Sequence, residues 1–536
     1  MSNQIDQFVH ALLPPPESMP DYFWGEHGFE EQETLNVVSA LFERVKKNGF
    51  MDRPFLRSSK RVVTYAQAYD FVSQLSSFLT EELQLVSGNR VLLRGGNSIS
   101  MALHWLAVVN CGLVAVSTMP LLRAKELGEV IQKSRPTVAL CDQSLMQELK
   151  AAHDFVPCVS EIIGFDSHHL EGEAFIRASK FATNTWFCNT RPKDIALLAF
   201  TSGTTGLPKA AAHTHLDILG SCEAWPKHIL KAAHTDIVMG SPPLAFTFGL
   251  GGLLIFPMYS GSSVFFPDAP YKPETMVQLM HEAQCTICYT APTFYRQMAP
   301  FIQKNPVPSL RISVSAGEAL ADATRQLWKQ ASHLEMIDGI GSTELFHIFV
   351  SSPPQSVRSG AIGKVVPGYI AQVVDSQGIE VPKGEVGRLR VKGPTGCKYM
   401  GDLRQANYVQ GGWNFPGDLF KQDIDGYLYY QSRDDDMIIT AGYNVGAPEV
   451  EDALLKHPAV QECAVIGQKD EERGMLVKAF CVLRDGYSPG LDLTKILQDH
   501  VKNLLAPYKY PREISYVDKL PRTETGKLQR FKLKEI

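Results

Sequence analysis

The chain has 536 residues, of which 44% are hydrophobic and 20% are charged. This length is more than one ordinary hydrophobic core fills, so we expect two or more domains that fold without disulfide support. The formal net charge is −5, and Lys and Arg residues are scattered along the chain. Nucleic-acid binding needs a concentrated basic surface, so no nucleic-acid partner is expected.

Targeting and membrane signals are weak. The first ten residues, MSNQIDQFVH, lack a basic region followed by an apolar core, so no secretory signal is predicted. The longest apolar stretch, Phe248 to Tyr259, is too short to span a bilayer. Ten widely spread cysteines favour a reducing compartment, and the close pair Cys285 and Cys288 lies in a strand-like run without a second pair to complete a metal site. We expect a cytoplasmic monomer or homodimer without membrane insertion.

The first 350 residues alternate between strand-like and helix-like segments. Residues 11–36 are rich in proline and aromatic residues and predict an irregular arm packed on the body, followed by a helix over 35–48. From Arg90 onward, apolar strands alternate with helices, and the same rhythm continues after residue 209. This alternation predicts right-handed parallel βαβ units with helices on both faces of the sheets.

The rest of the chain has a different texture. Residues 360–432 contain short strands separated by turn residues, which predicts a small β-rich subdomain. The last hundred or so residues form a compact α+β pattern. We therefore predict an α/β fold with two domains. The large N-terminal domain, 1–433, has parallel βαβ sheets and the β-rich subdomain, and the small mobile C-terminal domain is 434–536.

A phosphate-loop candidate lies near the middle of the chain. Thr201–Lys209 reads TSGTTGLPK and follows Asp194–Phe200, an apolar run that predicts a buried parallel strand. Gly203 and Gly206 let backbone amides approach an anion, and Lys209 adds a positive charge. The spacing differs from that of P-loop ATPases, because the lysine follows Leu-Pro. Taken alone, such a stretch is more often a flexible surface loop.

Two further clusters follow predicted strands. Ile337–Glu344, IDGIGSTE, runs from an apolar strand into glycine, hydroxyls and a carboxylate, an order that suits a Mg²⁺ ligand beside a phosphate. The alternative is an ordinary strand-to-helix turn capped by Ser342 or Thr343. Ser315–Ala319, SAGEA, also follows an apolar strand, and its small residues leave room for a flat ring.

Three polar segments lie nearer the C-terminus. Asp418, in GGWNFPGDLF, follows a glycine and would otherwise be a turn-stabilising aspartate. The run SRDDDMII, 432–439, is on composition alone a solvated turn. The loop PRTETGK, 521–527, ends in a lysine that would ordinarily face solvent.

These segments, in this order, resemble the signature motifs of the adenylate-forming superfamily, which includes acyl- and aryl-CoA ligases, adenylation domains of peptide synthetases and firefly-type luciferases. The resemblance implies that Lys527, Thr343, Glu344 and Lys209 are catalytic and that Glu344 and Thr201 hold Mg²⁺. It implies that Asp435 is the hinge on which the C-terminal domain rotates. The residues that it assigns to ATP or AMP are Thr201, Ser202, Gly203, Thr204, Thr205, Gly206, Ser315, Ala316, Gly317, Glu318, Asp338, Gly339, Ile340, Gly341, Ser342, Thr343, Asp418, Arg433 and Lys527. The residues that it assigns to the CoA side are Ala441, Gly442, Arg473 and Gly474.

Segments such as TMPLLRAKEL, GSPPLAFTFGLGG and DGIGSTELFHIF extend the resemblance over nearly the whole chain, and they look most like the benzoate-CoA ligase group, including 2-aminobenzoate-CoA ligases. The residues at this group's acid pocket are Ala245, Phe246, Phe248, Gly317, Gly341, His347 and Ile348. Phe246 and Phe248 with two glycines suit a flat aromatic ring. A histidine in an apolar run is more often a core residue, but His347 could also hold the carboxylate or an ortho amine.

Three positions depart from the group's usual residues. Pro416 replaces a threonine and loses a hydroxyl, Ala210 stands behind Lys209 where glycine is usual, and Ala441 replaces the first of a glycine pair. None of these changes removes a charged or metal-binding group, so activity is expected.

The function implied by the resemblance is an ATP-dependent aryl-CoA ligase that uses ATP, Mg²⁺ and CoA to activate benzoate or 2-aminobenzoate. One alternative is a stand-alone enzyme that loads an aryl acid onto the phosphopantetheine arm of a carrier protein. A second is a catalytically silent homologue that senses a ligand.

Overall fold

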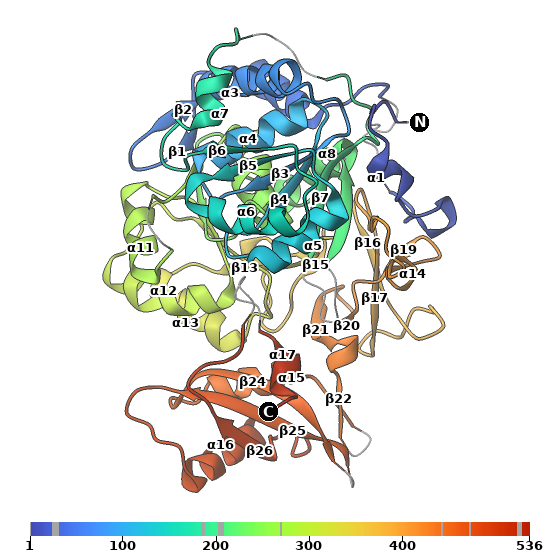
Figure 1. Ribbon diagram of the computed structural model, residues 1–536. Helices are drawn as coiled ribbons and strands as arrows, with labels where there is room; N and C mark the ends of the chain where they lie inside the picture. Colours follow the sequence, from blue (N-terminus) through green and yellow to red (C-terminus); the bar gives the residue numbers. More distant parts are fainter. Residues whose placement is uncertain are drawn as a thin grey trace.

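The computed structural model describes residues 2–23, 32–183, 188–201, 208–268, 271–440, 443–470, 473–522 and 528–536. Figure 1 shows a large layered domain with a smaller C-terminal domain attached at one end. None of the helices in these ranges is long and apolar enough to cross a bilayer.

The larger sheet of the N-terminal domain has nine strands and is parallel through its centre. Its strands, in spatial order, are β15 Lys364–Val365, β14 Ile348–Ser351, β13 Met336–Gly341, β12 Ile312–Ser315, β11 Ile287–Thr290, β9 Ile237–Gly240, β10 Ser263–Phe265, β1 Pro54–Arg57 and β2 Val62–Thr64. The strands from β13 to β1 in this order pair parallel, and β14, β15 and β2 pair antiparallel at the two edges.

A second sheet of six strands lies beside it. Its order is β6 Glu161–Phe165, β5 Val138–Asp142, β3 Arg90–Arg94, β4 Val114–Thr118, β7 Ile195–Thr201 and β8 Lys209–Thr214. The first five strands are parallel, whereas β7 and β8 form an antiparallel pair. The prediction that β7 is a parallel strand is therefore correct for its pairing with β4 and wrong for its pairing with β8. The candidate phosphate loop connects the two strands of an antiparallel pair.

The other elements of this domain are helices, most of which pack between the two sheets or on their outer faces. They are α1 Phe8–Ala11, α2 Val37–Lys47, α3 Tyr65–Ser77, α4 Ile99–Asn110, α5 Ala124–Ser134, α6 Met146–Phe155, α7 Glu173–Ala178, α8 His215–Glu223, α9 Thr247–Leu250, α10 Phe256–Ser260, α11 Pro273–Glu282, α12 Pro292–Lys304 and α13 Asp322–Ser332. Shorter helical turns are η1 Pro16–Ser18, η3 Phe78–Glu82, η4 Gln143–Leu145, η5 Pro226–Leu230, η6 Gly251–Ile255 and η7 Pro354–Ser356.

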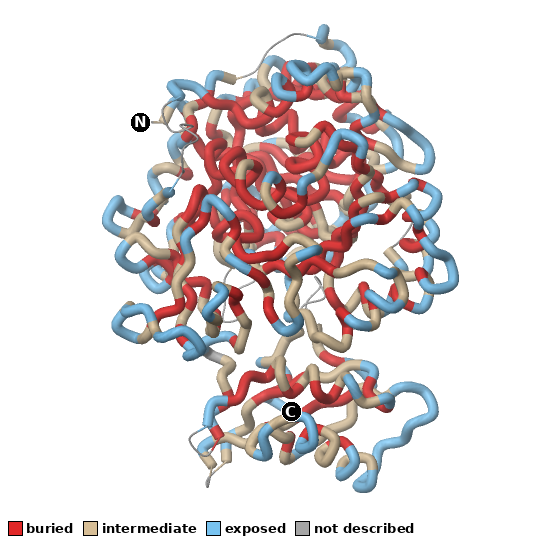
Figure 2. The backbone as a smooth tube through the Cα atoms, turned by 180° about the vertical axis from the view of Figure 1, so that it is seen from behind, coloured by how far each residue is buried: buried red, intermediate tan, exposed pale blue. Residues whose placement is uncertain are grey.

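The hydrophobic clusters show how the layers stack. In β3, Val91 and Leu93 face a central cluster that includes α2, α3, α4 and residues of both sheets, whereas Leu92 faces α5 and α6. All twelve residues of α4 are buried, as expected for a helix between two sheets. Helices α11, α12 and α13 cover the other face of the nine-stranded sheet. Figure 2 shows the resulting buried interior. The predicted fold class is confirmed.

The β-rich subdomain has six strands, β16 Ile370–Val374, β17 Val386–Lys392, β18 Val409–Gln410, β19 Trp413–Asn414, β20 Asp418–Gln422 and β21 Leu428–Arg433, with helix α14 Gln405–Tyr408. The N-terminal arm packs against it, because the backbone amide of Phe23 donates to Gly393 O at 3.0 Å. The turn η8, Asp434–Asp436, leads out of β21 into the C-terminal domain.

The C-terminal domain is a five-stranded sheet with helices. Its elements are β22 Ile438–Thr440, β23 Tyr443–Val445, α15 Ala447–Leu455, β24 Val460–Asp470, β25 Gly474–Leu483, α16 Leu491–Leu504, β26 Glu513–Tyr516 and α17 Arg530–Leu533. It has its own hydrophobic cluster, which includes residues of β24, β25, α15 and α16. Figure 1 shows β22 leading away from the large domain.

Candidate active site

A buried tyrosine joins two of the predicted catalytic residues. Tyr399 lies in a segment that pairs with β8, and its hydroxyl donates to Oε1 of Glu344. Nζ of Lys209, at the start of β8, donates to the same hydroxyl at 3.4 Å. Burial, followed by the charge of Glu344, raises the pKa of Tyr399, so the phenol stays protonated. The structure thus brings Lys209 and Glu344 to one phenol.

The predicted turn after β13 is a strand-to-strand connection, not a strand-to-helix cap. It joins β13 to the antiparallel β14, so the capping alternative is wrong. Within it, the carbonyl oxygen of Thr343 lies 2.8 Å from Nε2 of the buried His213, and the Ser342 hydroxyl lies 3.0 Å from that of Tyr408. The turn is therefore held from β8 on one side and from α14 on the other.

The segment Ser315–Ala319, most of which the resemblance assigns to ATP or AMP, lies beside β13. Ser315 pairs with Asp338 across parallel strands, so both segments leave the same edge of the sheet. Gly317 has φ +90°, and an added Cβ there would meet nothing within 4 Å. Glu318 accepts from Oγ1 of Thr293 at 2.7 Å. The geometry leaves an open face beside Gly317, as a flat base needs.

Two residues assigned to ATP or AMP, Asp418 and Arg433, form an ion pair. Arg433 Nη1 lies 3.0 Å from Oδ1 of the buried Asp418, across the β20–β21 pair. Nη1 also donates to Pro416 O at 2.9 Å, so the residue that replaces the usual threonine contributes its carbonyl. The charges of Glu344 and Asp418 both raise the pKa of Tyr408, after burial, which places the pair near the Glu344 cluster.

The predicted acid pocket lies in a group of aromatic rings. The ring of His347 has its centroid 4.6 Å from Phe256, 5.2 Å from Trp225 and 5.4 Å from Phe248. Tyr289 lies 5.8 Å from Phe248. Burial lowers the pKa of His347 to about 3, against a smaller opposing effect of the Phe248 backbone. The imidazole is therefore neutral at physiological pH.

Several polar atoms in this aromatic group have no hydrogen bond of normal geometry among the described residues. They are both ring nitrogens of His347, the Tyr289 hydroxyl and Nε1 of Trp225. Buried polar atoms ordinarily have partners, so these atoms are exceptions within the core. Sequence reasoning missed Trp225 and Tyr289; Tyr289 lies close to Phe294 and Tyr295 in sequence, whereas Trp225 has no aromatic neighbour that would mark it.

Glycines bring the aromatic group against β13, the strand that leads into Thr343 and Glu344. A Cβ on Gly341 would lie 2.5 Å from the His347 carbonyl oxygen, and one on Gly339 would lie 2.6 Å from Ile348. Gly341 and Ile348 are paired in the β13–β14 register. The acid pocket and the β13 turn therefore share a border. Ala245 is buried in the segment before α9, and Phe246 is half-buried at the start of that helix.

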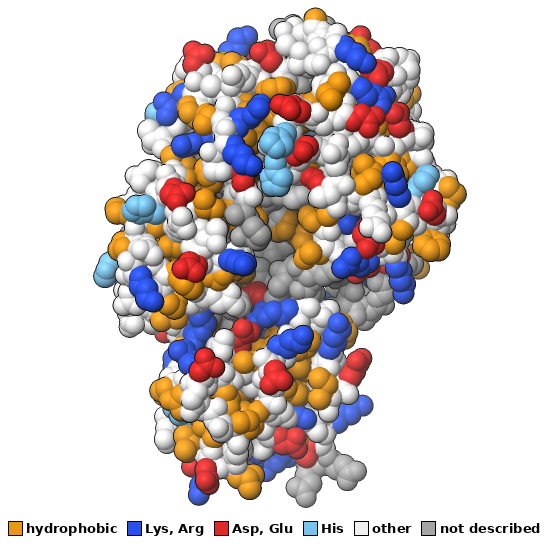
Figure 3. Space-filling view, turned by 60° about the vertical axis from the view of Figure 1, so that its left-hand side comes forward, with side chains coloured by type: hydrophobic (Ala, Val, Ile, Leu, Met, Phe, Trp, Pro, Cys, Tyr) orange, Lys and Arg blue, Asp and Glu red, His pale blue; other side chains and the backbone are white. Residues whose placement is uncertain are grey.

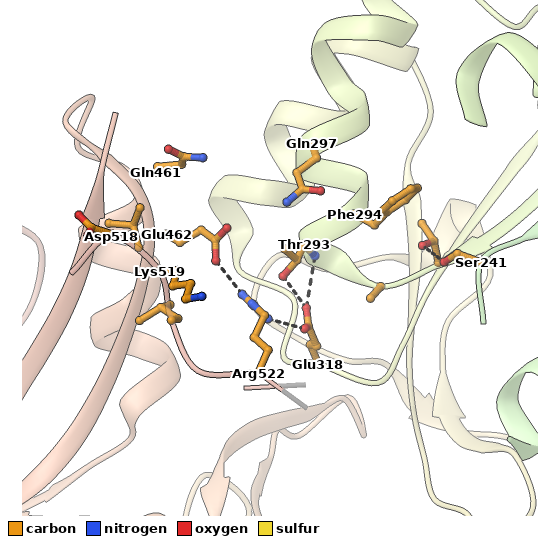
Figure 4. Close-up of a pocket in the computed structure, with 14 residues that line it drawn as sticks. Ser241, Thr293, Phe294, Gln297, Glu318, Gln461, Glu462, Asp518, Lys519 and Arg522 are labelled. Carbon is orange, nitrogen blue, oxygen red and sulfur yellow. Dashed lines mark hydrogen bonds and ion pairs between the residues drawn. The ribbon is translucent and has the colours of Figure 1, made fainter. Parts of the chain in front are cut away.

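A cleft of about 460 Å³ separates the large domain from the C-terminal domain. Figure 4 shows Thr293, Glu318 and Phe294 on one wall and Glu462, Lys519 and Arg522 on the other. Figure 3 shows a hollow at this boundary with Lys and Arg side chains along it.

Some predicted site residues are not placed. Ser202, Gly203, Thr204, Thr205, Gly206, Ala441, Gly442 and Lys527 lie outside the described residues, as does the side chain of Asp435. Arg473, in the turn before β25, donates its backbone amide to Asp470 at 2.8 Å, and Gly474, the first residue of β25, pairs with Thr440, so both lie in the C-terminal domain. No contact between described residues joins them to the Glu344 cluster.

Mg²⁺ fits the donor chemistry around Glu344. The side chain is a buried carboxylate beside the hydroxyl-bearing Ser342 and Thr343, and Mg²⁺ prefers such hard oxygen donors. Among the described residues there is no group of three His, Cys, Asp or Glu that could hold a metal by itself. A cation here would share its ligands with substrate phosphate oxygens, as Mg²⁺ usually does.

Comparison with known proteins agrees with this geometry. Two family models match, the AMP-binding enzyme model over residues 42–399 and the AMP-binding enzyme C-terminal domain model over 449–527. The benzoate–CoA ligase of Thauera aromatica is 35% identical over 533 residues, which is 98% of each chain. A 4-hydroxybenzoate–CoA/benzoate–CoA ligase of Rhodopseudomonas palustris is 30% identical and covers 89% of each chain.

Solved structures are similar over almost the whole length. The anthranilate CoA ligase AuaEII, crystallised with anthranoyl-AMP, superposes with a TM-score of 0.88 at 34% identity, over 94% of this chain and 97% of that one. A benzoate CoA ligase from Burkholderia xenovorans LB400 gives 0.84 at 30% identity, over 93% and 100%. The chain therefore belongs to the AMP-binding enzymes, the adenylate-forming family whose motifs its phosphate loop resembles.

Proposed function

We propose that the protein is an aryl-CoA ligase that activates a benzoate-type acid with ATP and transfers the acyl group to CoA. The observation that carries this proposal is the shared border of the aromatic group and the β13 turn, where Gly341 contacts the His347 backbone. A ring held at Phe248 and His347 would present its carboxylate toward the residues that flank Glu344. The similarity to benzoate- and anthranilate-CoA ligases supports the same substrate class.

The first half-reaction makes the carboxylate electrophilic. A carboxylate oxygen attacks the α-phosphorus of ATP, the bond to pyrophosphate breaks, and an aryl-AMP mixed anhydride results. The chain's task is to align the reactants and to balance negative charge. We assign charge balance to Lys209 and Lys527, and contact with the α-phosphate to Thr343. Mg²⁺, held by Glu344 and Thr201, would neutralise phosphate charge.

The second half-reaction transfers the acyl group. The CoA thiolate attacks the carbonyl carbon of aryl-AMP, the bond to the phosphate oxygen breaks, and AMP leaves. We propose that the 434–536 domain first rotates about Asp435, which would carry the segment around Ala441, Gly442, Arg473 and Gly474 toward the thiol. The strands β22 and β23 border this segment. Figure 1 shows β22 leading away from the large domain, so a rotation would be needed to bring the segment closer.

The ring substituent is a finer part of the proposal. Unpartnered polar atoms of His347, Tyr289 and Trp225 among aromatic rings suit a benzoate that carries a small polar group. We therefore propose 2-aminobenzoate or benzoate as the acid.

Two assays test this function. The first is exchange of labelled pyrophosphate into ATP with Mg²⁺ and a panel of substituted benzoates. The second is thioester formation with free CoA compared with a phosphopantetheinylated carrier protein. Exchange with aryl acids and transfer to CoA support the proposal. Transfer only to the carrier protein, or no exchange with any acid, contradicts it in favour of carrier loading or of a silent homologue.

Lys527 gives a sharper test of the mechanism. Because it is assigned to charge that develops at the α-phosphorus, Lys527→Ala should abolish exchange far more than thioester formation from supplied aryl-AMP. Equal losses in both half-reactions would refute its role.

A further inference from the structure

A continuous set of polar contacts crosses the cleft between the two domains. On the large domain, Glu318 accepts from Oγ1 of Thr293 at 2.7 Å, and the backbone amide of Thr293 approaches the same oxygen at 3.3 Å. On the other side, Nη1 of Arg522 donates to Oε1 of Glu318 at 2.8 Å. Its Nη2 donates to Glu462 at 2.9 Å. Figure 4 shows the guanidinium between the two carboxylates.

The two carboxylates have different roles, because they belong to different domains. Glu462 lies on β24 of the C-terminal domain, so its contact with Arg522 persists however that domain turns. Glu318 lies on the large domain, in a segment assigned to ATP or AMP. The contact of Arg522 with Glu318 exists only in the present domain arrangement. Glu462 therefore orients the guanidinium in every domain arrangement, whereas Glu318 binds it only in the present one.

The backbone of Arg522 lies at the base of the segment that carries Lys527. Arg522 forms an antiparallel bridge with Leu528, and the amide of Gln529 donates to Pro521 O at 2.9 Å. Residues 523–527 lie between these two fixed ends. A contact of the Arg522 side chain therefore acts at one end of the segment that contains Lys527.

We propose that Arg522 is a positioning residue for acid activation, which holds the Lys527 segment against the nucleotide-binding segment through its ion pair with Glu318. The proposal rests on the proposed function and deepens it. Arg522 contacts no reacting atom in this scheme; it lowers the entropic cost of placing Lys527. Thioester formation, for which the domain must turn, requires the same ion pair to break.

A second contact across the boundary marks the same arrangement. The amide of Ala323, in α13, donates to Oδ1 of Asp452 in α15 at 3.0 Å. This hydrogen bond joins one charged group to a backbone amide. It therefore stabilises the present domain arrangement less than a guanidinium shared by two carboxylates does.

The test compares both half-reactions in Arg522→Ala, Arg522→Lys, Glu318→Gln and Glu462→Gln. We expect Arg522→Ala and Glu318→Gln to slow pyrophosphate exchange about tenfold or more in kcat with KM for the acid little changed. Thioester formation from supplied aryl-AMP should be unchanged or faster, because an ion pair that must break is gone. Arg522→Lys should recover part of the exchange, since it keeps the charge and loses the fork.

Lys519 provides the matched control. It lines the same cleft three residues earlier and forms no hydrogen bond or ion pair within the described part of the chain. Lys519→Ala should leave both half-reactions within about twofold of the wild type. Equal slowing of both half-reactions by Arg522→Ala, or slowing of exchange by Lys519→Ala as large as that by Arg522→Ala, overturns the proposal.

Hydrogen exchange separates this proposal from the proposed function. In the protein without substrates, Arg522→Ala should speed exchange of backbone amides in 316–323 and 513–522, and Lys519→Ala should not. This readout needs no turnover, so an inactive wild type would refute the ligase while the contact itself is still tested. Unchanged exchange in Arg522→Ala refutes the positioning role.

Discussion

Asp338 is a buried carboxylate in β13, within the segment predicted to bind the nucleotide. It is 4% exposed, and its Oδ1 accepts from the amide of Gly339 at 3.0 Å. Burial raises the pKa of Asp338 to about 6, although Arg325 and the Gly339 amide oppose the shift. The ionised form is therefore kept in the fold at a cost, which the rest of the sheet must offset.

The sign of this shift gives a test with Asp338→Asn. The folded state binds the proton more tightly than the unfolded state, so this group makes the free energy of unfolding fall as pH rises from about 4 to about 6. Asparagine has no such proton. From pH 4 to pH 7, the free energy of unfolding of the variant should therefore rise relative to that of the wild type by up to about 3 kcal/mol, as measured by urea denaturation. A difference that does not change with pH would contradict the raised pKa.

His347 is the second residue whose chemistry can be isolated. It is neutral over the working pH range, and neither ring nitrogen forms a normal hydrogen bond in the described part of the chain. If it bonds an ortho amine, His347→Phe should lower the 2-aminobenzoate to benzoate ratio of kcat/KM by about threefold to tenfold, the value of one neutral hydrogen bond. Phe256→Leu, which changes the packing on the same imidazole without removing a polar atom, is the comparison. An equal fall in that variant would assign the effect to packing.

Among the elements, the segment 396–400 connects three parts of the large domain. Lys398 is buried and lies 2.7 Å from Oδ2 of Asp217 in α8, and it donates to the Tyr22 hydroxyl of the N-terminal arm at 2.6 Å. Burial lowers the pKa of Lys398, but Asp217 and Tyr22 raise it more, so the ammonium is charged. Its neighbour Tyr399 holds Glu344. The arm, α8 and the active-site phenol thus depend on one segment.

Removing one charge of this pair should be costly. Lys398→Met leaves Asp217 buried and unpaired, which typically costs about 3–5 kcal/mol of unfolding free energy. Lys227→Met breaks a pair with Glu223 in which the lysine is 42% exposed, and it should cost less than about 1 kcal/mol. Chemical denaturation of both variants gives the comparison. Similar losses would show that burial does not set the strength of the Lys398 pair.

The elements also show what sequence can reveal. Strand and helix periodicity predicted the alternation through β3, α4 and β4, because an apolar period is a local property of the chain. The antiparallel β7–β8 pair was not predicted, since hydrophobicity does not name a strand's partner. Motifs marked Lys209 and Glu344, but Tyr399, which joins them, lies 190 and 55 residues away from them in sequence. A single tyrosine outside any motif gives no sequence signal for such a contact.

Arg522 illustrates the same limit between domains. Its position in a loop next to Lys527 was visible, but its partners lie 204 and 60 residues earlier. Only the arrangement of the two domains puts Glu318 and Glu462 on either side of one guanidinium. Contacts of this kind depend on tertiary structure, so the motif predicted the lysine and not the residue that would position it.

Over the whole molecule, buried histidines are gathered in the large domain. Burial lowers the pKa of His104, His213 and His215 to about 4 and that of His347 to about 3. All four are thus neutral in the fold. In the C-terminal domain, the pKa of His457 is also lowered by burial, but its imidazole is much less deeply buried. Acid should therefore act on the layered sheets of the large domain before it acts on the C-terminal sheet.

This distribution predicts the pH dependence of stability. Each buried histidine has a lowered folded pKa, so its contribution is complete above pH 6.5 and is lost as pH falls toward 4. Near pH 5 the unfolded chain binds up to about four more protons at these histidines than the folded chain does. Asp338 binds about one proton more in the folded chain between about pH 4 and 6. The slope of the unfolding free energy against pH near pH 5 is therefore up to about three protons. Urea denaturation at several pH values measures this slope, and hydrogen exchange should show the large domain opening first. The contribution of a single histidine can be measured at His104. Its ring lies between Phe165 and Phe175, and its Nδ1 lies 2.7 Å from Ser100 O. His104→Gln should reduce the slope by about one proton. A free energy of unfolding that stays flat from pH 7 to pH 5, or a slope that His104→Gln leaves unchanged, would mean that these histidines are already protonated in the folded chain.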